Sequence, residues 1–71
     1  METGAKGMAQ GGITLAEIEV ALREKRVAPS RFGRGALNDP RLVFDLRRGR
    51  RLTPANAARV RAYVQRLGAE G

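Results

Sequence analysis

Apolar residues recur at helical spacing along most of the chain, and no segment alternates apolar and polar residues as a half-buried strand does. In residues 15–26, one face collects Leu15, Ile18, Ala21 and Leu22 at about 100° per residue. Thr14 and Glu17 have the spacing of a capping box, which predicts the start of this helix. Val20 lies off the apolar face, so it is either a lone exposed valine or a contact for a partner.

A second, short helix is predicted over residues 29–37. Pro29 suits the first helical position because its missing N–H is no loss there, whereas Ala28 is a poor cap. Two glycines lower the helix propensity of this segment. Gly33 makes sense if another helix passes close to it, while the sequence offers no reason for Gly35.

The third predicted helix, residues 40–48, separates its side chains into two groups. Asp39 is its expected cap, Pro40 its first residue and Gly49 the residue that turns the chain out of it. The inner group is aliphatic and consists of Leu42, Val43 and Leu46. The outer group consists of Arg41, Phe44, Asp45 and Arg48, so an aromatic ring and charged groups share the exposed side.

The last predicted helix covers residues 54–67. Thr53 is its cap, Pro54 takes the first position and Gly68 is expected to end it. Its inner face consists of Ala57, Val60, Val64 and Leu67. The pattern as a whole therefore predicts an all-α fold, a small bundle of about four helices in one domain over residues 13–68.

Composition narrows the chemistry that such a domain could perform. The glycine-rich residues 1–12 have no apolar periodicity, and we expect them to form a disordered, flexible N-terminal tail. The chain has no cysteine and no histidine, which removes disulfides, Cys-based zinc sites and histidine acid–base chemistry. We therefore expect no enzyme activity, no catalytic residue, no cofactor and no metal site.

Positive charge is concentrated in the predicted helices. Residues 23–66 contain thirteen Arg or Lys and only three Asp or Glu, a surplus larger than the net charge of +7 of the whole chain. Twelve of the fourteen cations are arginine, whose planar fork binds phosphate and guanine edges, although a GC-rich genome would also favour arginine. No apolar run approaches membrane-spanning length and no signal peptide is visible, so we expect a cytoplasmic protein without membrane contact.

Two short helices joined by a few residues, the second basic on its outer side, are typical of a helix-turn-helix. Residues 29–37 would be the supporting helix and residues 40–48 the recognition helix. A major groove accepts one helix whose outer side chains meet base edges. Arginine can bind guanine, a carboxylate can accept from cytosine, and an apolar ring can touch thymine methyl groups.

The stretch "RFGRGALNDPRLVFDLRRGRR", residues 31–51, resembles the lambda-repressor-like (Cro/XRE-type) helix-turn-helix DNA-binding domains. The likeness covers residues 27 to about 67. It matches Phe32 and Gly33 to the family's apolar-Ala pair, Asp39 to its cap, Val43 and Leu46 to its buried pair, and Gly49, Arg50 and Arg51 to its closing turn. The segment is also similar to "RFG-x-x-AL-x-DP-x-FVFDLR-x-GR" stretches of alphaproteobacterial activators of gene transfer agent genes.

The resemblance implies roles for individual residues. The residues that would face the bases are Pro40, Arg41, Phe44 and Asp45. The residues that would contact phosphates are Ser30, Arg31, Arg48, Arg50 and Arg51. The chain departs from the family pattern at Arg47, where the family prefers Glu, and in having one further helix where the family usually has two. A second protomer, or sequence absent here, would then complete the core.

These implications predict a sequence-specific regulator of transcription that binds double-stranded DNA in the nucleoid as a homodimer or in tandem. Alternatives remain at single positions, because Asp45 could instead pair with Arg41 or Arg48, and Phe44 could fold back onto the core or a dimer partner. The alternative for the whole chain is a protein-interaction module that presents Val20 and Phe44 to RNA polymerase or another regulator. RNA binding ranks third, because few aromatic rings are present for base stacking.

Overall fold

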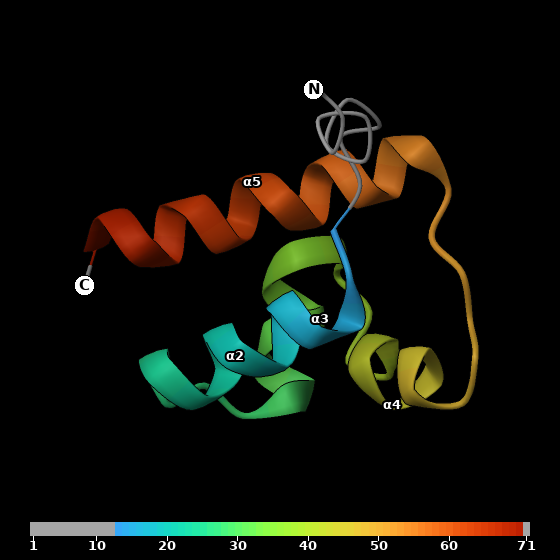
Figure 1. The fold of residues 1–71 in the computed structure, drawn as a ribbon, viewed down its shortest axis with the longest axis horizontal. Helices are drawn as coiled ribbons and strands as arrows, with labels where there is room; N and C mark the ends of the chain where they lie inside the picture. Colours follow the sequence, from blue (N-terminus) through green and yellow to red (C-terminus); the bar gives the residue numbers. More distant parts are fainter. Residues whose placement is uncertain (1–12, 71) are drawn as a thin grey trace, which may run out of the picture.

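The computed structural model describes residues 13–70, and these residues form four α-helices and no strand. The helices are α2 (Leu15–Lys25), α3 (Pro29–Leu37), α4 (Leu42–Arg47) and α5 (Pro54–Glu70). Figure 1 shows α5 lying across the other three helices, with α4 at one end of the molecule. The predicted all-α class is confirmed, whereas the tail expected over residues 1–12 lies outside the described residues.

Side-chain and glycine signals at the helix ends account for most of these boundaries. At the start of α2, the Thr14 hydroxyl accepts from the Glu17 N–H at 3.1 Å, and Glu17 Oε1 accepts from the Thr14 N–H at 2.9 Å. The capping box is therefore confirmed. At the start of α5, Thr53 Oγ1 accepts from the Asn56 N–H at 3.1 Å. α3 begins at Pro29 without a side-chain cap, as expected from Ala28.

Four helix ends differ from the prediction, and one of them is the end of α4, which lies at Arg47 instead of residue 48. α2 ends at Lys25, because Arg26 adopts a left-handed conformation with φ 55°. α4 begins at Leu42 instead of residue 40, because the Leu42 N–H bonds back to the Asp39 carbonyl across a tight turn. α5 continues through Gly68 to Glu70, since a glycine within an exposed last turn weakens a helix without ending it.

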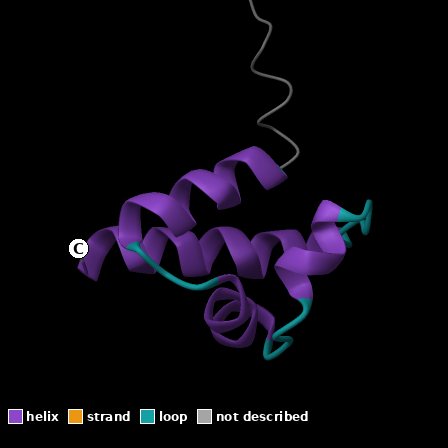
Figure 2. Ribbon diagram, turned by 90° about the horizontal axis from the view of Figure 1, so that it is seen from below, coloured by secondary structure: helices purple, strands orange, loops and turns teal. Residues whose placement is uncertain are grey.

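The core lies where α2, α3, α4 and α5 converge. Phe32 is fully buried at its centre, and the ring of Tyr63 meets it edge-on with a centroid distance of 5.2 Å. The buried cluster consists of Ile18, Leu22, Phe32, Ala36, Leu42, Val43 and Val60. Every helix contributes at least one of these side chains, and α4 packs mainly against α3 and also against α2. Figure 2 shows α4 at one end of this arrangement.

Both glycines of α3 face close neighbours. A Cβ atom at Gly33 would overlap the Asp39 carbonyl oxygen and would lie 3.0 Å from Leu42 Cβ. The close approach expected at Gly33 is therefore confirmed. A Cβ atom at Gly35 would lie 2.5 Å from the Tyr63 hydroxyl oxygen, so Gly35 leaves room for the ring that packs against Phe32.

Candidate nucleic-acid interface

The turn between α3 and α4 is held by backbone hydrogen bonds. Asn38 adopts a left-handed conformation with φ 58°, and its N–H bonds to the Arg34 carbonyl at 2.9 Å. The Asp39 N–H donates to the Gly33 carbonyl at 3.0 Å, and the Asp39 side chain accepts from the Arg41 N–H at 3.1 Å. The helix cap predicted at Asp39 was wrong, because the N-cap of α4 is Arg41 and has no side-chain cap. Asp39 instead caps the turn that precedes the helix.

The exit of α4 is equally well defined. Gly49 has φ +110°, its N–H bonds to the Leu46 carbonyl, and the Arg50 N–H bonds to the Asp45 carbonyl at 2.9 Å. This pair of bonds is a Schellman motif, in which a left-handed residue lets the chain leave the helix while the last carbonyls stay satisfied. The predicted role of Gly49 is confirmed, and the motif returns Arg50 to the side of Asp45.

Arg50 forms an ion-pair cluster with the two aspartates of this region. Its Nη1 atom lies 2.7 Å from Asp39 Oδ2 and 3.5 Å from Asp45 Oδ2. The hydrogen bond from Arg50 lowers the pKa of Asp39, and the bond from the Arg41 N–H lowers it further. Arg50, which was predicted to contact phosphate, thus forms ion pairs with two side chains of its own chain. It pairs Asp45 with Arg50 instead of with Arg41 or Arg48.

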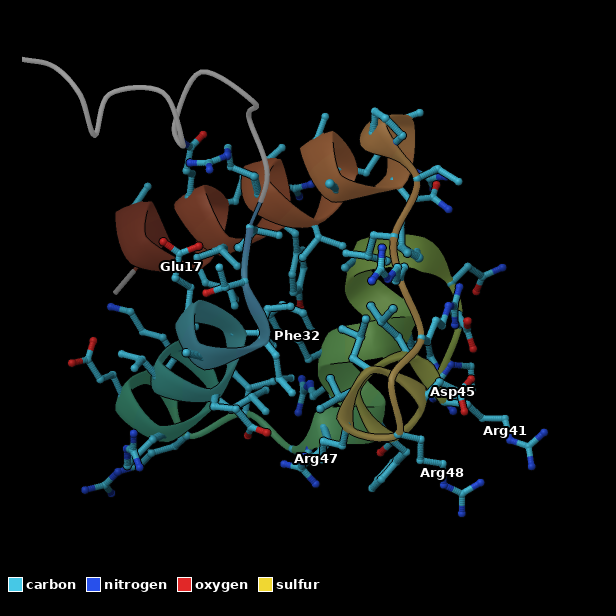
Figure 3. The ribbon with its side chains drawn as sticks, turned by 45° about the vertical axis from the view of Figure 1, so that its right-hand side comes forward. Glu17, Phe32, Arg41, Asp45, Arg47 and Arg48 are labelled. Atoms are coloured by element: carbon cyan, nitrogen blue, oxygen red, sulfur yellow. The ribbon has the colours of Figure 1, made fainter. Side chains whose placement is uncertain are left out.

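The other outer residues of α4 remain exposed. The guanidinium groups of Arg41 and Arg48 form no ion pair with the described residues, and Figure 3 shows both side chains extending away from the ribbon near Asp45. Phe44 is 45% exposed and therefore does not fold back onto the core. Pro40 is also exposed, and it belongs to the turn that precedes α4. The outer side of α4 is thus basic with one accessible ring.

Arg47 connects α4 to α2. Its Nε and Nη2 atoms donate to the two carboxylate oxygens of Glu19 at 2.8 and 2.9 Å. The hydrogen bond from Arg47 lowers the pKa of Glu19. The Arg47 guanidinium also lies 5.8 Å from the centroid of the Phe44 ring. Arg47 therefore has a partner of opposite charge on α2.

The outer face of α3 adds further positive charge. Ser30 and Arg31, predicted to contact phosphates, are exposed, and they line a shallow recess together with Arg34, Gly35 and Tyr63. Arg34 was not among the predicted phosphate contacts, although it follows Arg31 by three residues and so shares its face of the helix. Arg51, the remaining predicted phosphate contact, is exposed just beyond the Schellman motif.

Metal-binding groups and membrane-spanning helices were both sought in the part of the chain that the structure describes, and neither is present. Residues 13–70 contain no group of three or more His, Cys, Asp or Glu side chains that could hold a metal ion. None of their helices is long and apolar enough to cross a bilayer. No protein-family model, curated protein or solved structure matches this chain.

Proposed function

We propose that this protein is a sequence-specific regulator of transcription that binds double-stranded DNA and reads the major groove with α4. One observation carries the proposal: α4 buries Leu42 and Val43 completely, while Arg41 and Arg48, the residues that flank it, are exposed and extend away from the ribbon (Figure 3). A helix held in this way can enter a groove with its outer side chains while its inner side chains keep it on the domain.

The charges near α4 suit this role. Arg48 and Arg51 are exposed at and beyond the end of α4, and both are free to meet phosphates. Ser30 and Arg31 are exposed at the start of α3. Arg41 precedes the first turn of α4, and N-terminal residues of a recognition helix contact base edges. Phe44 supplies an apolar surface for thymine methyl groups.

The ion-pair cluster supports the same proposal by fixing the helix. Arg50 links Asp39 in the turn before α4 to Asp45 within it. A reading helix must be held at one angle, because a small displacement moves every side chain away from its base edge. The similarity of residues 31–51 to activators of gene transfer agent genes favours activation as the mode of regulation. A DNA-binding regulator of this kind would act at the nucleoid.

Selection of bound sequences from a random pool of double-stranded DNA at about 150 mM salt tests the proposal, because nonspecific charge attraction is weak there. We expect a reproducible motif. Arg41→Ala should weaken binding to that motif by about 1–3 kcal/mol and relax the preference at one base pair. Arg23→Ala is the matched control, because it removes an exposed arginine of α2 to which neither a DNA contact nor a contact between copies is assigned. No enrichment by a folded protein would refute the proposal.

A second candidate function is favoured by two exposed hydrophobic side chains. Val20 on α2 is 42% exposed and Phe44 on α4 is 45% exposed. Such side chains can anchor a protein partner, such as RNA polymerase or another regulator. On this alternative, Phe44→Ala would abolish capture of RNA polymerase, and Arg51→Ala would leave it intact.

A further inference from the structure

The outer face of α2 carries the carboxylates that the fold does not use in ion pairs. Within residues 13–69, Glu19, Asp39 and Asp45 pair with arginines. Glu17 and Glu24 remain, and both are exposed on the side of α2 that faces away from the core. Only Oε1 of Glu17 is occupied, by the capping bond to the Thr14 N–H.

Val20 lies between these two glutamates. The three residues Glu17, Val20 and Glu24 occupy positions i, i+3 and i+7, so they share one face of the helix. The outer face of α2 therefore consists of an exposed valine with a glutamate on either side. The two glutamates lie about 10 Å apart along the helix axis.

The outer face of α5 has the same spacing with the opposite charge. Arg59, Ala62 and Arg66 also occupy positions i, i+3 and i+7, and all three are exposed. Neither arginine forms an ion pair with the described residues. When the two faces are aligned in parallel, each glutamate meets an arginine and Val20 meets the small side chain of Ala62.

We propose that α2 of one copy of this chain docks against α5 of a second copy through these two faces. α2 and α5 bury their inner faces in the same core, and Figure 1 shows them on different sides of the molecule. One chain therefore cannot bring its own two faces together. A contact of this kind leaves one α2 face and one α5 face free, so it is heterologous and can continue along a row of copies.

Because each copy has a net charge of +7, a second copy is expected to bind at the α2 face and not elsewhere on the surface. Two copies repel each other over most of their surfaces, and the α2 face is where unpaired carboxylates meet an approaching basic surface. Exposed ion pairs are weak, so we expect a dissociation constant on the order of 1 mM in solution. Copies held side by side on another molecule would reach such concentrations locally.

Sedimentation equilibrium of the full chain at millimolar concentration, without DNA, tests the inference independently of the proposed function. Glu24→Arg and Arg66→Glu should each weaken self-association by about tenfold, because each replaces an attraction with a repulsion. The double variant E24R/R66E keeps the net charge and restores opposite charges at the contact. We expect its self-association to return to that of the native chain.

Two further variants separate a defined contact from a general effect of charge. Arg34→Glu changes the net charge as Arg66→Glu does, but it lies on α3, and it should leave self-association unchanged. Val20→Ser changes no charge and should weaken association, because it removes the apolar part of the contact. The inference is overturned if the single charge reversals associate like the native chain, or if E24R/R66E remains monomeric while circular dichroism shows it folded.

Discussion

The substitution Gly33→Ala tests the contact that fixes α4 against α3. The added Cβ atom would overlap the carbonyl oxygen of Asp39 and lie 3.0 Å from Leu42 Cβ. The Asp39 oxygen belongs to the backbone of the turn, so no side-chain rotation can remove the overlap. The turn must move, and this movement weakens the 3.0 Å hydrogen bond between the Asp39 N–H and the Gly33 carbonyl.

The expected loss of stability follows from three opposing contributions. Overpacking against a rigid neighbour costs up to about 3 kcal/mol, and a weakened backbone hydrogen bond costs about 1 kcal/mol more. Alanine recovers about 1 kcal/mol through its higher helix propensity. We therefore expect the free energy of unfolding to fall by about 3 kcal/mol, most of what a single core of this size supplies.

Gly35→Ala, two residues further along α3, is the matched control. Its Cβ atom would meet the hydroxyl end of Tyr63 at 2.5 Å, and this side chain can turn away. The loss of the edge contact with Phe32, about 1 kcal/mol, nearly cancels the gain in helix propensity. Urea denaturation followed by circular dichroism measures both variants. The reasoning fails if Gly33→Ala is as stable as the native protein, or if Gly35→Ala loses as much stability.

Three further outcomes are expected from the charged residues. In Arg50→Gln, the pKa of Asp39 measured by NMR should rise toward its ordinary value. A carboxylate with a lowered pKa stabilises the fold at pH values above its unfolded-state pKa, and this stabilisation is lost as the pH falls through the folded-state pKa. The native chain should therefore lose more stability on acidification than the Arg50→Gln variant. Arg47→Gln should likewise raise the pKa of Glu19, and an unchanged NMR titration would contradict the observed pairing. Arg51→Ala should weaken binding to all DNA sequences alike and reduce the salt slope by about one, whereas a loss confined to one motif would assign Arg51 to base contact.

Sequence signals that act over a few residues predicted the structure well. The Thr14 capping box, the Thr53 cap and the Gly49 turn depend on residues at most five positions apart, and all three are present. The start of α4 was placed two residues early. An Asp-Pro pair fits both a helix start and a tight turn, and the bond from the Leu42 N–H to the Asp39 carbonyl selects the turn.

Contacts between distant residues could not be predicted from spacing. Arg47 pairs with Glu19 across 28 positions, and Gly35 is explained by a ring of α5. Both depend on how the helices pack, which periodicity alone does not specify. The exposed outer side of α4, in contrast, was predictable. Its separation from Leu42 and Val43 depends only on the angle between successive residues in one helix.

The position of Arg50 changes the expected charge at the interface. A phosphate contact requires a free cation, but Arg50 is shared by two carboxylates, and the cluster of Arg50, Asp39 and Asp45 carries a net charge of −1. Such a cluster releases few counterions from DNA. Attraction to phosphate would then come from Arg48 and Arg51, while Arg50 would hold α4 and orient Asp45 toward a base. Loss of Arg50 should therefore reduce sequence preference more than it reduces the salt slope.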